Sequence, residues 1–160
     1  MQINTMRCTH CKGEMSPATL VSLSGEEHGV RLSIEGMPAM RCAEGHTRFI
    51  APEFAVRMME TFVAGGPLAP LEAAAEKGLL RKRLHCAGCG AELAQPEGER
   101  LAAKREVELK GLAPFAIQAE IPKYRCGGCG KESLPPAKAL NEGLMKASVQ
   151  AFRSAGITPT

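Results

Sequence analysis

The chain has 160 residues, of which 20 are Lys or Arg and 17 are acidic, and its formal net charge is +3. All the acidic residues are glutamate, which excludes Ser-His-Asp triads, aspartyl nucleophiles and magnesium held by aspartate. With one tyrosine, five phenylalanines and no tryptophan, the chain lacks the aromatic burial that stabilises a small core, so it needs a structural metal or disulfides.

The N-terminal stretch MQINTMRC contains no apolar segment of the kind that marks a secretory signal. No run in the chain approaches the roughly 18 apolar residues of a membrane span, so we expect a cytoplasmic protein without membrane contact. The seven cysteines are an odd number and lie mostly in C-x2-C pairs. In an intracellular chain this pattern favours metal binding over disulfides.

The first half begins with the C-x2-C pair of Cys8 and Cys11. Residues 20–24 and 30–36 alternate apolar and polar side chains, which predicts a β-hairpin with GEEHG as its turn. The phrase GMPAMRC then leads to Cys42. Because proline cannot donate to a sheet ladder, we expect it to end the second strand or to lie at a sheet edge.

Two helices are predicted after this hairpin. The first, over 52–63, places two phenylalanines and a methionine on one face at helical spacing. The second has a leucine and alanine stripe that follows the GGP break, and we expect it to form a linker helix over 65–84. The simple interpretation is that each apolar stripe packs on its own ribbon or on another helix. The alternative is that one stripe is a dimer or partner face.

The second half repeats the order of the first. Its segments are the pair Cys86 and Cys89, strands at 103–110 and 115–121, the phrase IPKYRC, the pair Cys126 and Cys129, and a helix at 136–154. Between its first cysteine pair and its proline phrase, the second half has six more residues than the first. This repeated order indicates an internal duplication. We predict an α+β fold of two zinc-ribbon β-hairpin units, over 1–64 and 85–160, each followed by an α-helix.

The seven cysteines and one histidine complete two ligand sets. The sets are Cys8, Cys11, Cys42 and His46 in the first half, and Cys86, Cys89, Cys126 and Cys129 in the second. Each contains the four ligands of a closed structural zinc site and lacks the open position of a catalytic one. We therefore predict two zinc ions per chain and no enzymatic activity. In the alternatives, His46 is a surface residue beside a three-ligand site, or the ribbons hold iron as in rubredoxin-type electron transfer.

Seven thiolates and two zinc ions would bring the net charge from +3 to zero, which removes the general electrostatic case for nucleic acid. A local basic group remains, consisting of Arg81, Lys82, Arg83, Lys123 and Arg125. Cations interact favourably with the C-terminal end of a helix dipole, so the simple interpretation of residues 81–83 is a solvated helix end. The alternative is a patch beside the second ribbon that contacts phosphate groups.

The phrases MRCTHCKGEM and GMPAMRC, separated by a hairpin, resemble the YgiT-type zinc fingers that form the N-terminal domain of MqsA-like antitoxins. The likeness covers about residues 6–60 and, more loosely, 84–135. It implies that the seven cysteines are zinc ligands and that the zinc domain is structural and contacts a protein toxin. This chain departs from the family in the shifted His46 and in showing no helix-turn-helix domain, the part that binds DNA in that family.

The sequence therefore predicts a bacterial zinc-binding adaptor or regulator that acts by binding a protein partner, with a homodimer formed through the helices as a further option. The alternative is a transcriptional regulator that binds nucleic acid through the second ribbon and residues 81–83. Salt distinguishes the two, because nucleic-acid binding weakens steeply between low and moderate salt, whereas a hydrophobic protein interface hardly changes.

Overall fold

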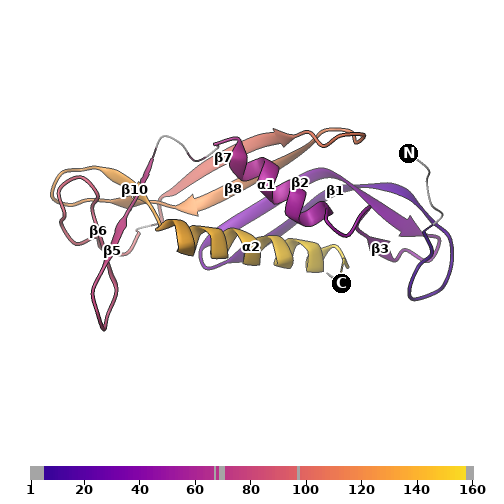
Figure 1. Ribbon diagram of the computed structural model, residues 1–160, viewed down its shortest axis with the longest axis horizontal. Helices are drawn as coiled ribbons and strands as arrows, with labels where there is room; N and C mark the ends of the chain where they lie inside the picture. The colour runs from indigo at the N-terminus through magenta and orange to yellow at the C-terminus, as the bar shows by residue number, and fades with distance from the viewer. Residues whose placement is uncertain (1–5, 67, 69–70, 97, 158–160) are drawn as a thin grey trace.

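Two antiparallel hairpins build the centre of the fold, shown in Figure 1 as a computed structural model that describes residues 6–66, 68, 71–96 and 98–157. The first hairpin joins β1 (Met15–Glu27) to β2 (Val30–Cys42). Its turn consists of His28 and Gly29, whose φ angles are +50° and +77°, as in the two-residue turns whose twist matches that of the strands. The second hairpin joins β7 (Arg100–Val107) to β8 (Phe115–Pro122).

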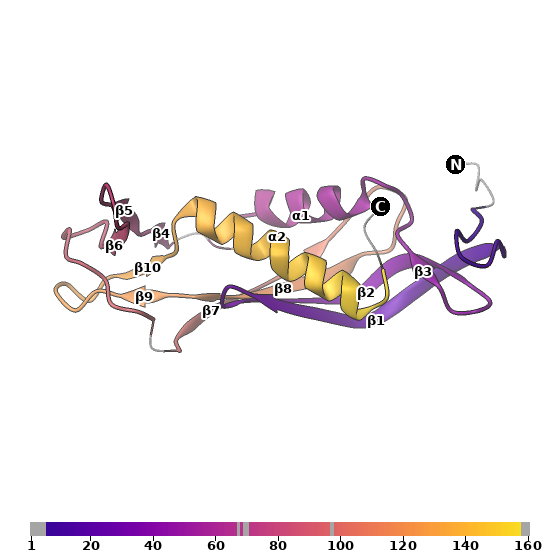
Figure 2. The same ribbon diagram turned by 90° about the horizontal axis from the view of Figure 1, so that it is seen from below.

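The two hairpins form one sheet. β2 pairs with β8 in antiparallel register, which gives the strand order β1-β2-β8-β7, and β3 (Thr47–Arg48) pairs with the end of β2. The helices α1 (Phe54–Ala64) and α2 (Ala137–Ser154) lie over one face of this sheet (Figure 2). No helix in the described part of the chain is long and apolar enough to cross a membrane.

Each helix lies on the hairpin of the other half. α2 follows the second hairpin but packs mainly on β1 and β2, and α1 follows the first hairpin but contacts β7. The fold is mixed α+β, as predicted, but the structure does not separate into two ribbon-and-helix units. A two-stranded hairpin is only marginally stable alone. Joining the hairpins makes a larger sheet that the two helices cover together.

The pairing of β2 with β8 relates the two halves by an approximate two-fold axis. In this ladder Ser33 faces Gln118 and Ile34 faces Ile117. The shift in numbering that superimposes the two proline phrases carries Ser33 to position 117 and Ile34 to position 118. Applied forwards to Ser33 and backwards to Gln118, the shift turns their pair into positions 117 and 34, which form the other pair. A contact that maps onto itself in this way is isologous, as in a two-fold dimer. A single chain thus contains the arrangement of a homodimer.

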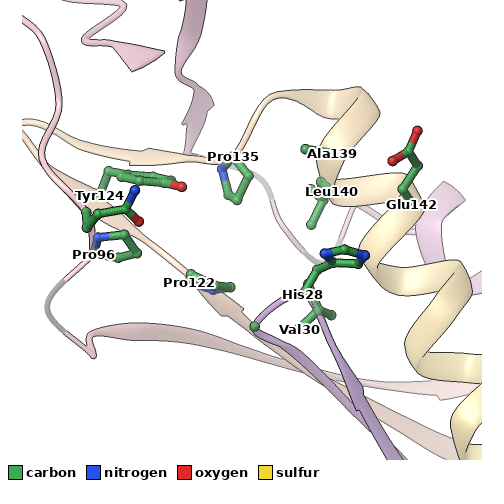
Figure 3. A pocket seen from close by; sticks show the side chains of 11 residues that line it. His28, Val30, Pro96, Pro122, Tyr124, Pro135, Ala139, Leu140 and Glu142 are labelled. Atoms are coloured by element: carbon green, nitrogen blue, oxygen red, sulfur yellow. The ribbon is translucent and has the colours of Figure 1, made fainter. Parts of the chain in front are cut away.

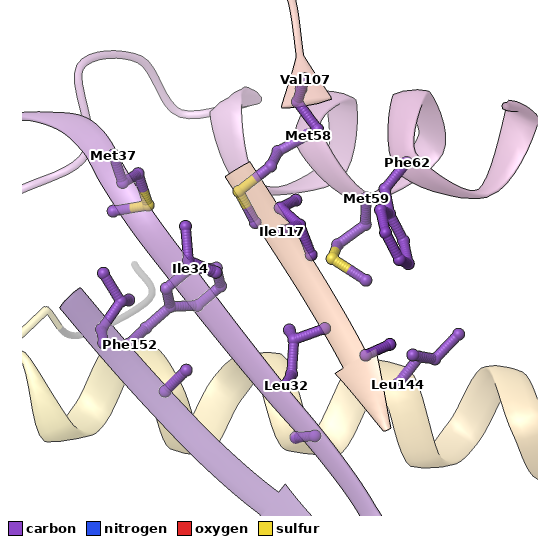
Figure 4. Packing of buried hydrophobic residues seen from close by; sticks show 14 of the residues in the cluster. Leu32, Ile34, Met37, Met58, Met59, Phe62, Val107, Ile117, Leu144 and Phe152 are labelled. Atoms are coloured by element: carbon purple, nitrogen blue, oxygen red, sulfur yellow. The ribbon is translucent and has the colours of Figure 1, made fainter. Parts of the chain in front are cut away.

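One hydrophobic core between the sheet and the helices contains residues of both halves (Figure 4). Ile34 of β2 and Ile117 of β8 are fully buried in it. Every second residue of β8 from Phe115 to Ile121 is buried, so one face of the strand meets the helices and the other stays more exposed. The stripe predicted for the first helix is confirmed, because Phe54, Met58 and Phe62 are all buried.

The predicted linker helix over 65–84 is wrong for the described residues of that segment, while residues 67, 69 and 70 lie outside the described residues. The chain there forms the short strands β4 (Glu72–Ala73), β5 (Ala75–Lys77) and β6 (Arg83–His85). Gly78, between β5 and β6, has a φ of +128°, a conformation that favours glycine. Strand pairing outweighs the helical pattern, since β4 pairs with β10 (Glu132–Leu134), which also pairs with β9 (Tyr124–Arg125).

The strands of the first hairpin are longer than the alternating pattern predicts. Each has 13 residues, because the turn uses only His28 and Gly29 and residues 25–27 remain in β1. Pro38, which was expected to end the strand or lie at an edge, is inside β2 opposite Thr19. It lies between the β2 residues that pair with β8 and those that pair with β3, so the missing amide donor is tolerated as at a sheet edge.

The backbone of α2 comes very close to β1 at Gly25. A Cβ atom at Gly25 would lie 2.2 Å from the carbonyl oxygen of Ala147 and 2.4 Å from the amide nitrogen of Ala151. Both are backbone atoms, so no change of side-chain rotamer would relieve the overlap. The absence of a side chain at this position therefore sets the distance between helix and strand.

We expect Gly25→Ala to lower the free energy of unfolding by about 3 kcal/mol, because the added methyl group forces α2 away from the sheet. Denaturant unfolding measures the change. The matched control is Gly127→Ala, where the new Cβ would meet nothing within 4 Å and stability should change by less than about 0.5 kcal/mol. Equal effects of the two substitutions would contradict the close packing of α2 on β1.

Candidate metal centres

Four cysteines of the second half converge from two turns that follow β6 and β9. The Sγ atoms of Cys86 and Cys129 are 3.6 Å apart, and those of Cys89 and Cys126 are 3.4 Å apart. All four sulfur atoms lie within 4.8 Å of one another. Sulfurs at about 2.3 Å from a tetrahedral zinc ion are separated by about 3.8 Å, so the cluster has the dimensions of a zinc site. These separations are too long for disulfides, and all seven cysteines are free.

The first half brings together three cysteines and His46. The Nδ1 atom of His46 lies 3.5 Å from Cys8 Sγ and 3.4 Å from Cys42 Sγ, and the sulfur atoms of Cys11 and Cys42 are 3.7 Å apart. These four ligand atoms also lie within 4.8 Å of one another. The structure therefore assembles all eight predicted ligands into two groups that fit two metal ions. His46 points into the first group rather than standing alone on the surface.

Three of the four ligand turns share one backbone design. The residue after the second cysteine has positive φ, with +62° at Lys12, +77° at Gly90 and +76° at Gly130. Its N–H donates to the carbonyl oxygen of the first cysteine of the pair, as Gly90 does to Cys86 at 2.9 Å. The chain thereby curls around the metal position, and glycine is the residue that adopts this conformation with least strain.

Backbone N–H groups also prepare the sulfur atoms for metal binding. The N–H of Gly128 donates to Cys126 Sγ at 3.4 Å. The N–H groups of Cys129 and Gly128 lower the pKa of the Cys126 thiol to about 6, and those of Cys11 and His10 lower the pKa of the Cys8 thiol to about 7. Because the thiolate is the form that binds metal, these turns favour the ligand state of Cys126 and Cys8 before any ion is present. A hydrogen bond from the backbone of Lys131 lowers the pKa of Cys129, but contact with the Cys86 sulfur and burial outweigh it and raise that pKa to about 11.

The fourth turn is one residue shorter than the other three. In the second half Gly130 donates to the carbonyl oxygen of Cys126, four residues back, whereas Gly45 donates to that of Cys42, three residues back. The N–H of Cys42 donates to the oxygen of His46, as the N–H of Cys126 does to that of Lys131. His46 thus occupies the position of Lys131, and the cysteine position is deleted. The imidazole is long enough to reach the metal from there.

The turns that carry the two ligand groups lie at opposite ends of the molecule, one beside β3 and the other beside β6 and β9 (Figure 2). Each belongs to a small hydrophobic cluster separate from the main core. The buried ligands are Cys8, Cys42, Cys86 and Cys126. Metal binding would therefore stabilise the ends of the molecule that the main core does not reach.

The basic residues proposed as partner or nucleic-acid contacts are mostly paired with glutamates. Lys82 lies 3.3 Å from Glu76, and Arg83 lies 3.0 Å from Glu92. Lys123 and Arg125 both contact Glu132, at 3.1 Å and 3.0 Å. These ion pairs are partly or largely exposed and so contribute little to stability, but they reduce the positive potential of the group. Arg81 is exposed in the turn between β5 and β6.

Two features of the site regions have no simple signal in the sequence. The ring of His10 packs beside that of His46, with centroids 4.9 Å apart. A cavity of about 340 Å³ lies between the first hairpin turn and the start of α2, lined by His28, Tyr124 and Glu142 among others (Figure 3). The cavity joins segments that are far apart in the chain, so local patterns do not reveal it.

Comparison of the chain with protein-family models, with curated proteins and with solved structures finds no match. The interpretation of the two ligand groups therefore depends on their own geometry and chemistry.

We expect His46→Ala to reduce the zinc content from two ions per chain to one, because the first group would keep only three ligands. Native mass spectrometry counts the ions directly. The control is His10→Ala, which removes the neighbouring ring but none of the ligands and should keep both ions. Two tightly bound ions in His46→Ala would show that His46 is not a ligand.

Proposed function

We propose that this protein is a non-catalytic zinc-binding adaptor or regulator that acts by binding another protein. The observation that carries the proposal is that each ligand group already provides four protein ligands. A zinc ion held by four protein side chains has no position for water or substrate, which is the arrangement of a structural site. The role is of the kind that the zinc domain has in MqsA-like antitoxins, which the cysteine phrases resemble.

The surface between the helices supports a protein partner. A groove of about 380 Å³ runs between α1 and α2 and is lined mainly by apolar side chains, including Met59, Leu144 and Met145. Met145 is 56% exposed and Val63 is 45% exposed. Apolar side chains that remain accessible in a groove between two helices are typical of surfaces that receive the apolar face of a partner helix.

Cobalt substitution tests whether the sites are closed. We expect two Co²⁺ ions per chain with tetrahedral absorption bands, including thiolate charge-transfer bands, because both groups are sulfur-rich. Added azide or cyanide should leave the spectrum unchanged, since neither site has a position for another ligand. A spectrum that titrates with azide would indicate an open position and would contradict the non-catalytic assignment.

Copurification from the native host tests the protein partner. We expect a specific protein to remain bound through a high-salt wash, and Met145→Lys to abolish that binding by placing a charge in the groove. Val21→Lys is the matched control, because Val21 is 85% exposed on β1, away from the groove. A partner retained equally by both variants would exclude the groove as its binding surface. Bound nucleic acid that salt removes would instead support the alternative regulator.

A further inference from the structure

The turn between β5 and β6 presents two leucines to solvent. The exposed fractions of Leu79 and Leu80 are 103% and 99%, the highest among the exposed large apolar residues of the described chain. Figure 1 shows the β5–β6 hairpin projecting from the end of the molecule that carries the second ligand group. Leucine is usually buried in folded proteins. Two adjacent, fully exposed leucines at the tip of a projecting hairpin therefore indicate a surface that contacts another molecule.

The hairpin holds the leucines in this position. Lys77 pairs with Arg83 and Ala75 with His85 across the two strands. Gly78 closes the turn so tightly that a Cβ there would lie 2.1 Å from the carbonyl oxygen of Arg81. At the base, Leu84 packs against the cluster that contains Cys86 and Cys126. The tip is therefore a well-defined turn, and the base of its hairpin packs against the second ligand group.

The leucines are surrounded by positive charge. Residues 76–83 contain four cations and one carboxylate. Lys77 and Arg83 stand directly opposite each other, and like charges in facing positions are destabilising. Glu76 and Glu92 compensate part of this charge through their ion pairs with Lys82 and Arg83. An anionic surface would relieve the remaining repulsion while covering the leucines.

We propose that the β5–β6 hairpin binds the surface of an anionic lipid bilayer, contrary to the expectation from the sequence of a protein without membrane contact. Leu79 and Leu80 enter the boundary between headgroups and acyl chains, and Lys77 and Arg81 lie at the level of the lipid phosphates. Apolar insertion combined with a few basic residues is the usual basis of reversible binding at a membrane surface. Duplex DNA fits less well, because its affinity depends on many phosphate contacts and two of the cations here are already paired with glutamate.

Vesicle cosedimentation with the zinc-loaded full chain tests this proposal. We expect binding to vesicles of phosphatidylcholine with phosphatidylglycerol and much weaker binding to phosphatidylcholine alone. The double variant Leu79→Ser, Leu80→Ser should lower the affinity about a hundredfold, because each inserted leucine contributes about a tenfold factor. Arg81→Glu should lower it about tenfold or more, and added salt should weaken the wild-type binding.

The matched control is Val21→Ser, which removes another exposed apolar side chain from β1 and should leave vesicle binding unchanged. Circular dichroism and zinc content should be unchanged in all variants, since every altered side chain is exposed. Vesicle binding that survives the double leucine variant would overturn the proposal. So would equal binding to neutral and anionic vesicles, or binding to duplex DNA without binding to vesicles.

Discussion

The antiparallel pairing of β2 with β8 is the interaction on which the rest of the structure depends. Each half contributes a hairpin with one apolar face and too few aromatic residues for a core of its own. Pairing the hairpins places Ile34 and Ile117 side by side and makes a single sheet. α2 can then cover the first hairpin and α1 the edge of the second. Without this ladder, each helix would lose part of the surface it packs against.

Metal ions held by the two ligand groups would stabilise the ends of the molecule that this core does not reach. The strands of the first hairpin are 13 residues long, and their far ends extend beyond α2 toward the first ligand group (Figure 2). A bound structural zinc contributes on the order of 10 kcal/mol in small zinc peptides, enough to order an end that has only a few buried side chains. In each group one buried cysteine is prepared as a thiolate, since backbone N–H groups lower the pKa of the Cys126 and Cys8 thiols.

The sequence predicts the ligands and the hairpins well because both leave local signals. Cysteine spacing defines the two groups, and alternation marks the strands. The sequence carries no local signal for the pairing of one hairpin with the other, because Ile34 could pack equally well beside any apolar strand. In the segment before Cys86 a local signal is present but misleading. Its pattern predicts a helix, but the strand pairing of β4 and the close turn at Gly78 override that pattern. Helix propensity is a weak preference that tertiary contacts override.

The six extra residues of the second half can be located only from the hydrogen bonds and the strand register. Met15, the first residue of β1, and Leu93, which precedes β7, make equivalent hydrogen bonds. Thr19 and Arg100 face the two prolines. Half of the extra residues lie between Leu93 and Arg100, before the hairpin ladder begins. The other half lie between Arg100 and the second proline, in the turn that joins β7 to β8. These insertions leave the central ladder unchanged, because they fall outside it.

The two ends of the molecule therefore differ around a common pairing geometry. One end shortens a ligand turn and recruits His46, whereas the other keeps four cysteines and is preceded by the β5–β6 hairpin with its exposed leucines. Two identical ends would present the same surface twice, as a two-fold dimer does. Because the two halves of one chain need not stay identical, we expect distinct partners to bind where the ends differ, while the shared sheet keeps those surfaces at a fixed separation.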